Sequence, residues 1–233
     1  MIKVRKSEER GHANHGWLDS YHTFSFADYY DPKFMGFRSL RVINEDRVAP
    51  GAGFGKHGHQ DMEILTYVLE GALAHKDSIG HEQVLGPNEI QRMSAGTGVM
   101  HSEYNGSKKE PVHFFQIWIE PARNGIEPSY EQLRFDPSEK LNKLKRLAGP
   151  TGGNGAARIN QDAHVFVAEL SKGATIPYDL AGKRAAWVHA VRGEVSVNGT
   201  PLKSGDAAAV SSEKLVMTGT GTESSEFLLF DLG

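Results

Sequence analysis

The sequence of 233 residues contains no cysteine. This absence excludes disulfide frameworks, thiolate zinc sites, iron–sulfur clusters and thiol nucleophiles, so any bound metal must be held by imidazole and oxygen ligands. Long apolar runs are absent as well: no stretch reaches the roughly 18 residues of a membrane-spanning helix, and the first residues carry no apolar run of signal-peptide length. We therefore expect a cytoplasmic protein without a membrane partner.

The sequence also has no surplus of positive charge. Its 26 Lys and Arg residues stand against 29 Asp and Glu residues, which gives a formal net charge of −3. Proteins that bind nucleic acids need a basic surplus to displace counterions from phosphates, so we expect no direct nucleic-acid partner. Hydrophobic residues make up 39% of a chain that also holds 26 glycines. That composition is typical of a globular protein with one large or two small domains.

Short apolar stretches rich in Val, Ile, Phe and Thr alternate with turns that contain Gly, Pro and Asn. This pattern predicts many strands joined by tight turns. The predicted strands span residues 21–26, 39–43, 63–69, 89–93, 112–119, 164–170, 186–191, 194–197, 207–210 and 226–230. We therefore predict an all-β protein built as a sandwich or barrel.

Two parts of the chain resemble each other. Residues 67–71, 86–88 and 114–119 are echoed in the same order by residues 189–193, 205–207 and 227–230. This self-similarity predicts two copies of one β unit. Residues 121 to 162 between them are rich in Pro, Gly, Asn and charge, and are expected to form a connector. Within it, residues 138–147 fit either a short helix capped by Ser138 or an extended segment.

Two pairs of polar residues have the spacing of alternate strand positions: His57 with His59, and His101 with Glu103. Residues i and i+2 of a strand project from the same face, so each pair presents two donor groups in one direction. Two such pairs on neighbouring strands would converge as four ligands. Three imidazoles and one carboxylate suit Fe(II), Mn(II), Ni(II), Co(II), Cu(II) or Zn(II), and leave two positions open on a six-coordinate ion.

The chain resembles the cupin superfamily in the spacing of Gly51, His57, His59, Glu63 and Gly71, followed by His101 and Asn105. Longer stretches closely resemble the pirin family: RGHANHGWLDSYHTFSF at residues 10–26, LTYVLEG at 65–71 and SAGTGVMHSE at 94–103. The resemblance runs through the whole chain and is most specific in the first 120 residues. It implies a bicupin of two double-stranded β-helix (jelly-roll) barrels, residues 1–130 and 131–233, of which only the first holds a metal.

On this resemblance, the metal ligands are His57, His59, His101 and Glu103, with Glu103 also the general base. One divalent transition metal is implied, with Fe(II) favoured and Cu, Ni, Co, Mn or Zn as alternatives. The chain departs from the family at Gly58, where most members carry proline, and at Lys56; neither departure removes a donor atom.

Glu63 competes with Glu103 for the fourth ligand position. It occupies the place of the carboxylate ligand in many cupins, and its other possible role is to orient an imidazole. The remaining histidines are expected to be surface or hydrogen-bonded core residues, with His113 the first candidate for an exception. The aromatic residues are expected in the core, with one or two in the wall of a pocket.

The second copy is expected to have lost the metal site. If Gly71 and Gly193 correspond, Asp179 and Ala181 take the places of His57 and His59. No histidine lies near Glu223, the position that the same spacing assigns to His101.

The resemblance implies a function as a quercetin 2,3-dioxygenase. Such an enzyme is expected to act as a monomer on a flavonol, a small planar phenol, and dioxygen, opening the heterocycle with release of carbon monoxide. The alternative is a redox-sensing regulatory protein, a transcriptional or metabolic-enzyme cofactor with a protein partner and incidental flavonol turnover. A zinc-dependent sugar isomerase would share the ligands, but the sequence shows no basic cluster for a phosphate.

Overall fold

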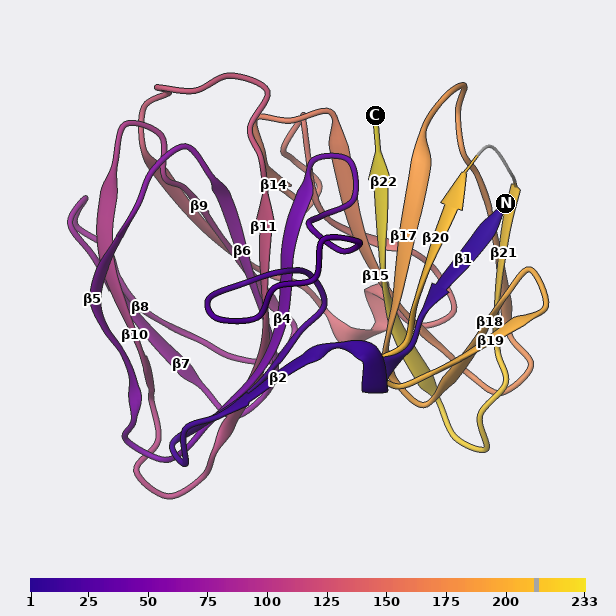
Figure 1. The fold of residues 1–233 in the computed structure, drawn as a ribbon, viewed down its shortest axis with the longest axis horizontal. Coiled ribbons are helices and arrows are strands. Elements are labelled where there is room, and N and C mark those ends of the chain that lie inside the picture. Colours follow the sequence, from indigo (N-terminus) through magenta and orange to yellow (C-terminus); the bar gives the residue numbers. More distant parts are fainter. Residues whose placement is uncertain (212–213) are drawn as a thin grey trace. The chain divides into compact units, whose positions relative to one another are not determined.

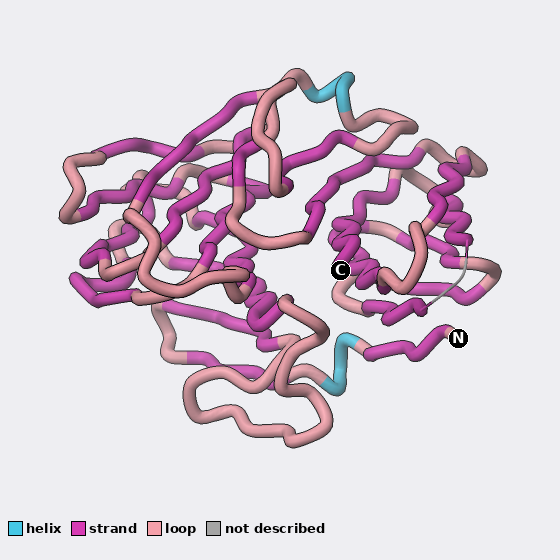
Figure 2. The backbone as a smooth tube through the Cα atoms, turned by 90° about the horizontal axis from the view of Figure 1, so that it is seen from above, coloured by secondary structure: helices cyan, strands magenta, loops and turns pink. Residues whose placement is uncertain are grey.

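The computed structural model describes residues 1–211 and 214–233, and its regular structure consists almost wholly of antiparallel strands (Figure 1). The helical segments of the described chain are two 3₁₀ turns, η1 (Ser7–Glu9) and η2 (Pro137–Glu139), seen in cyan in Figure 2. The prediction of an all-β protein is thus confirmed. No helix in the described part of the chain has the length and apolar character needed to cross a membrane.

One compact unit, here called the N-terminal unit, comprises Gly11–Phe135 and Thr151–Gln161. A seven-stranded sheet in the order β12-β9-β6-β11-β4-β3-β2 and a four-stranded sheet in the order β5-β10-β7-β8 form it. The strands of the unit are β2 (Gly11–Asn14), β3 (Leu18–His22), β4 (Leu40–Val48), β5 (Gly53–His59), β6 (Glu63–Glu70), β7 (Leu73–Asp77), β8 (Glu82–Leu85), β9 (Glu89–Ser94), β10 (Val99–Asn105), β11 (Val112–Ile119), β12 (Ser129–Arg134) and β14 (Ala157–Arg158).

The other compact unit, the C-terminal unit, comprises Met1–Arg10, Asp136–Pro150 and Asp162–Gly233. Within it, strands run in the order β1-β20-β17-β22-β15-β13 in one sheet and β16-β21-β18-β19 in the other. The first strand of the chain therefore lies beside β20. The strands are β1 (Ile2–Arg5), β13 (Lys145–Gly149), β15 (Ala163–Leu170), β16 (Thr175–Asp179), β17 (Ala185–Arg192), β18 (Glu194–Val197), β19 (Thr200–Lys203), β20 (Ala207–Ser211), β21 (Lys214–Gly219) and β22 (Ser225–Leu232).

The two units repeat one topology, which confirms the predicted internal repeat. The order β9-β6-β11-β4 in one corresponds to β20-β17-β22-β15 in the other, and β5-β10-β7-β8 corresponds to β16-β21-β18-β19. The aligned glycines Gly71 and Gly193 directly follow β6 and β17 and have φ values of 78° and 69°. Side chains other than glycine rarely adopt this left-handed conformation, which explains glycine at both turns.

Equivalent strands of the two units carry different kinds of side chain. In the C-terminal unit, Ile176 of β16 and Leu215 and Met217 of β21 belong to one apolar cluster with Phe227 and Leu229. Of their counterparts in the N-terminal unit, β5 carries His57 and His59, and β10 carries His101 and Glu103. The interior of the C-terminal sheet pair is thus a packed hydrocarbon core.

Three details differ from the sequence-based expectations. The segment from 121 to 162 is not a bare connector, because it contributes β12, η2, β13 and β14. Residues 138–147 form neither alternative as a whole: η2 is capped by Asp136, whose Oδ1 accepts from Ser138 N at 2.8 Å, and β13 starts at Lys145. Proline at position 137 favours such a short turn after an Asp cap. Glu223 lies after β21, so the counterpart of β10 is residues 214–219.

Candidate metal centre

Strands β5 and β10 bring the two predicted pairs together because they are antiparallel neighbours. His57 lies opposite His101 and His59 opposite Val99. The register shifts between His101 and Glu103, and Glu103 lies opposite Phe54, so β5 carries one extra residue there. Such a bulge bends a strand and changes the direction of the side chains beyond it.

The three histidines converge on one point. Ligand nitrogens of His57, His59 and His101 all lie within 4.8 Å of one another. Nε2 of His57 is 3.0 Å from Nε2 of His101, and Nδ1 of His57 is 2.7 Å from the Gly55 carbonyl oxygen. A carbonyl accepts only, so Nδ1 of His57 carries the proton and its Nε2 has the lone pair. The three imidazoles therefore have the arrangement of a metal-binding cluster.

Burial keeps two of these imidazoles, those of His59 and His101, uncharged at neutral pH. Burial, with a further contribution from His57, lowers the pKa of His59 to about 4. Burial and then the neighbouring imidazoles of His59, His57 and His75 lower the pKa of His101 to about 2. Neutral imidazole is the form that coordinates a metal, so His59 and His101 are in their ligating state at pH 7.

Glu103 is a buried carboxyl group beside the cluster, with 4% of its surface exposed. Nε2 of Gln116 donates to both of its oxygens, at 2.9 and 2.8 Å. Burial raises the pKa of Glu103 to about 7, against the lowering effect of the Gln116 hydrogen bond. A nearby cation would favour the charged form. Glu103 forms a second group of potential ligands with His101 and His75, whose donor atoms lie within 4.8 Å of one another.

The donor set fits one divalent transition metal. Three imidazole nitrogens and one carboxylate, without sulfur, match the preference of such ions. A buried carboxylate is unfavourable unless a proton or a nearby cation compensates its charge.

Glu63, the alternative carboxylate, belongs to neither group of potential ligands in the described chain. Its two oxygens accept hydrogen bonds from Ser94 Oγ at 2.7 Å and from Asn160 Nδ2 at 2.9 Å. His113, the other candidate, has its Nε2 3.0 Å from Oε1 of Glu45. Glu63 and His113 thus have described hydrogen-bond partners that are not part of the histidine cluster.

A cavity of about 490 Å³ opens in front of the cluster. His57, His59 and Glu103 face it together with Phe26, Phe54 and Trp118. The Trp118 and His59 rings meet edge to face, with centroids 4.9 Å apart. Aromatic walls next to a few polar groups are typical of a site for a flat organic molecule. One or two aromatic residues were expected in the wall of a pocket, and these three line it.

Several residues near the centre were not singled out from the sequence. Asp46 and Gln116 line the cavity, and His75, which was expected to be an ordinary buried or surface histidine, lies against His101. Asp77 stands two positions after His75 on β7. The same i, i+2 spacing that singled out the ligand pairs was present there, but the pairing of β7 with β10 is not visible in the sequence.

Comparison with known proteins agrees with the architecture. Residues 3–119 match the family model Pirin, and residues 146–232 match the model of the quercetinase C-terminal cupin domain. Quercetin 2,3-dioxygenase of Escherichia coli K12 is 48% identical over 232 residues, which cover 100% of this chain and 99% of that protein.

Two crystal structures are also similar. The E. coli protein YhhW has a TM-score of 0.94 and 48% identity, with 100% of this chain and 98% of that chain covered. Bacterial pirin YhhW in complex with nickel(II), also from E. coli, has a TM-score of 0.93 and 47% identity, with 100% and 99% covered.

The repeated sheet pairs and these matches define a bicupin protein, as the sequence resemblance implied. The chain belongs to the pirin family.

Proposed function

We propose that the protein is a metal-dependent dioxygenase that opens the heterocycle of flavonols such as quercetin and releases carbon monoxide. The observation that carries this proposal is a cluster of three imidazoles beside a buried carboxyl group, with His57, His59 and Glu103 in the wall of one aromatic-walled cavity. It is supported by full-length similarity to a protein named quercetin 2,3-dioxygenase. We further propose that it acts as a monomer in the cytoplasm.

His57, His59, His101 and Glu103 are the proposed ligands of a single ion, which we assign to the barrel of residues 1–130 and not to that of residues 131–233. Fe(II) is the favoured ion, and nickel(II), which the related E. coli structure contains, is among the alternatives. When bound, the ion supplies Lewis acidity and open coordination positions.

The protein's own residues bind the flavonol and move one proton. Phe26, Phe54 and Trp118 provide flat apolar walls for the fused rings. Burial raises the pKa of Glu103 to about 7, and a bound cation would favour the charged carboxylate, which is the form that accepts a proton. Glu103 therefore takes the proton of the flavonol 3-hydroxyl onto a carboxylate oxygen, while Gln116 holds that carboxylate in place. The deprotonated ring then takes up one dioxygen molecule and loses one carbon monoxide.

Turnover of quercetin in air tests the proposal. Protein purified without chelator or nickel resin is first analysed for its metal content, then mixed with quercetin. We expect loss of the flavonol absorbance and release of carbon monoxide, and neither with the His57→Ala/His59→Ala double variant. Wild-type protein that contains metal but leaves quercetin intact would refute the enzymatic role and favour the regulatory alternative.

A further inference from the structure

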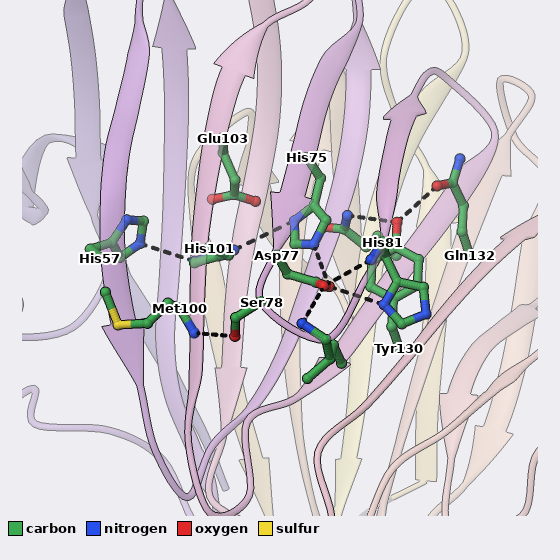
Figure 3. Close-up of polar contacts among 12 residues, drawn as sticks. His57, His75, Asp77, Ser78, His81, Met100, His101, Glu103, Tyr130 and Gln132 are labelled. Carbon is green, nitrogen blue, oxygen red and sulfur yellow. Dashed lines mark hydrogen bonds and ion pairs between the residues drawn. The ribbon is translucent and has the colours of Figure 1, made fainter.

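The side of His101 that faces away from His57 meets polar side chains of the neighbouring strand β7. In the pairing of these strands, Asp77 lies opposite His101 and His75 opposite Glu103. Directly opposite residues share a face of a sheet, so the two β7 side chains point the same way as the two on β10. The side chains of His75 and Asp77 are 1% and 0% exposed. Figure 3 shows them in one row with His101.

The hydrogen bonds in this row determine where each proton lies. Nε2 of His75 is 3.0 Å from Oδ2 of Asp77, and a carboxylate only accepts, so the His75 proton is on Nε2. Nδ1 of neutral His75 is then a bare acceptor. It faces Nδ1 of His101 at 3.5 Å, so Nδ1 of His101 is the donor. The lone pair of His101 is left on Nε2, 3.0 Å from the lone pair on Nε2 of His57. Two acceptors at this distance repel each other unless a cation lies between them, so the arrangement is suited to the proposed ion.

Asp77 is itself held in place from several sides. Its Oδ1 accepts the backbone N–H groups of Ile79 and His81, both at 3.0 Å, which close the turn after β7. Its Oδ2 also lies 3.2 Å from Nδ1 of His81. The ring of Tyr130 stacks on both His75 and His81, with centroids 5.0 and 4.5 Å apart (Figure 3). Little freedom remains for the carboxylate or the imidazole to rotate.

We propose that Asp77 and His75 are positioning residues that fix the tautomer of His101 and so make its Nε2 available to the metal. This rests on the ligand assignment of the proposed function and adds residues that touch neither ion nor substrate. His57 has the Gly55 carbonyl in the same role, 2.7 Å from its Nδ1. Such partners behind metal-binding histidines fix ring orientation and raise metal affinity. The partner of His101 is a side chain, so substitution can test it.

The first experiment needs no variant. Long-range ¹H–¹⁵N correlation spectra of the metal-free full chain with ¹⁵N-labelled histidine, recorded near neutral pH, report which ring nitrogen carries hydrogen. We expect Nδ1–H on His101 and Nε2–H on His75. A proton on Nε2 of metal-free His101 would overturn the proposal.

The second experiment reverses the polarity of the row with Asp77→Asn. The amide oxygen still accepts from Ile79 and His81, but an N–H now faces Nε2 of His75. His75 must then carry its proton on Nδ1 and donate toward His101, whose own proton moves to Nε2. We expect reversed tautomers and an affinity for Ni(II), measured by competition with a chelator, that is about 10- to 100-fold lower. Unchanged tautomers with unchanged affinity would also overturn the proposal.

His81→Phe is the matched control, because it keeps a ring against Tyr130 and leaves the Asp77 to His75 bond in place. We expect its tautomers and Ni(II) affinity to match those of the wild type. None of these measurements depends on turnover. If Asp77→Asn reverses the tautomers but the wild type does not consume quercetin, only the proposed function is refuted. If the wild type consumes quercetin but its metal-free His101 carries the proton on Nε2, only the positioning role is refuted.

Discussion

Asp46 is a buried carboxyl group in the wall of the cavity, and it is not one of the proposed ligands. Burial raises its pKa to about 7, although the Ser20 hydroxyl donates a hydrogen bond to it and lowers the pKa in part. A carboxyl group with a pKa raised by folding binds its proton more tightly in the folded state. Its contribution to stability is therefore complete at low pH and is lost as the pH rises from about 4 to about 7.

Asp46→Asn should remove this pH dependence. At about 1.4 kcal/mol for each pKa unit, the change between 3.8 and about 7 amounts to an effect on the order of 4 kcal/mol. We expect the metal-free variant to gain stability relative to the wild type as the pH rises, with a constant difference above about pH 7. Urea unfolding of both proteins from pH 4 to 8 measures it. A difference that does not vary with pH would contradict the prediction.

Gln116 controls the acidity of Glu103, because its amide donates to both carboxylate oxygens at 2.9 and 2.8 Å. Gln116→Leu removes these donors, so the pKa of Glu103 should rise further. A base must be ionised to act, so the acidic limb of the profile of kcat/KM against pH should move to higher pH. Each unit of that movement lowers the rate on the limb about tenfold. Gln132→Leu, the same substitution at a residue bonded to Tyr130, should leave the profile unchanged.

At the scale of elements, β5 is held by its pairing with β10 more than by its own sequence. Gly58 lies opposite Met100, and a Cβ added there would lie 2.9 Å from the Met100 sulfur, the end of a flexible side chain that is 40% exposed. Gly58→Ala should therefore be tolerated. Loss of the backbone freedom of glycine should stabilise the protein by up to about 1 kcal/mol, as measured by urea unfolding, with metal affinity retained.

Gly53, on the same strand, provides the contrast. A Cβ there would collide with the backbone carbonyl oxygen of Glu103 and lie 2.5 Å from Cα of Tyr104. Gly53→Ala must push the two strands apart beside the proposed ligand, and we expect it to lower both stability and Ni(II) affinity. If both glycine variants behave alike, close approach of β5 and β10 is not what places Glu103.

The same strands show how far sequence patterns predict this fold. The strand expected at 112–119 has those bounds in β11, because its run of Val, Phe, Ile and Trp suits a buried strand. Neither β5, which reads GFGKHGH, nor β10 was among the expected strands, since glycine and polar residues give no strand signal. The alternation rule still predicted that His57 lies with His59, and His101 with Glu103, within each strand. Contacts across strands, such as that of His75 with His101, depend on register and could not be predicted.

At the scale of the whole molecule, the two units share one topology but differ in the side chains of their equivalent strands. In the N-terminal unit, β10 carries His101, which is 2% exposed, and Glu103, which lines the cavity. In the C-terminal unit, the counterpart β21 carries Leu215 and Met217, which are both 0% exposed within the apolar cluster. A polar interior sacrifices hydrophobic stabilisation for ligand binding, whereas a filled interior does the reverse. On the proposed ligand assignment, the N-terminal unit would thus serve binding and the C-terminal unit stability.

Alanine substitutions in the two counterpart strands should therefore differ in their effect on Ni(II) affinity. Leu215→Ala leaves a cavity in a closed apolar core and should cost about 2–5 kcal/mol while metal affinity stays close to that of the wild type. His101→Ala removes a ligand and should abolish tight Ni(II) binding. Its ring is 2% exposed and packs against His57, His59 and His75, so the metal-free variant should also lose some stability, and the loss of Ni(II) affinity is what distinguishes it from Leu215→Ala. Unfolding curves and chelator competition on both variants measure stability and Ni(II) affinity. A Leu215→Ala protein that folds but no longer binds Ni(II) would contradict the assignment of binding to one unit and stability to the other.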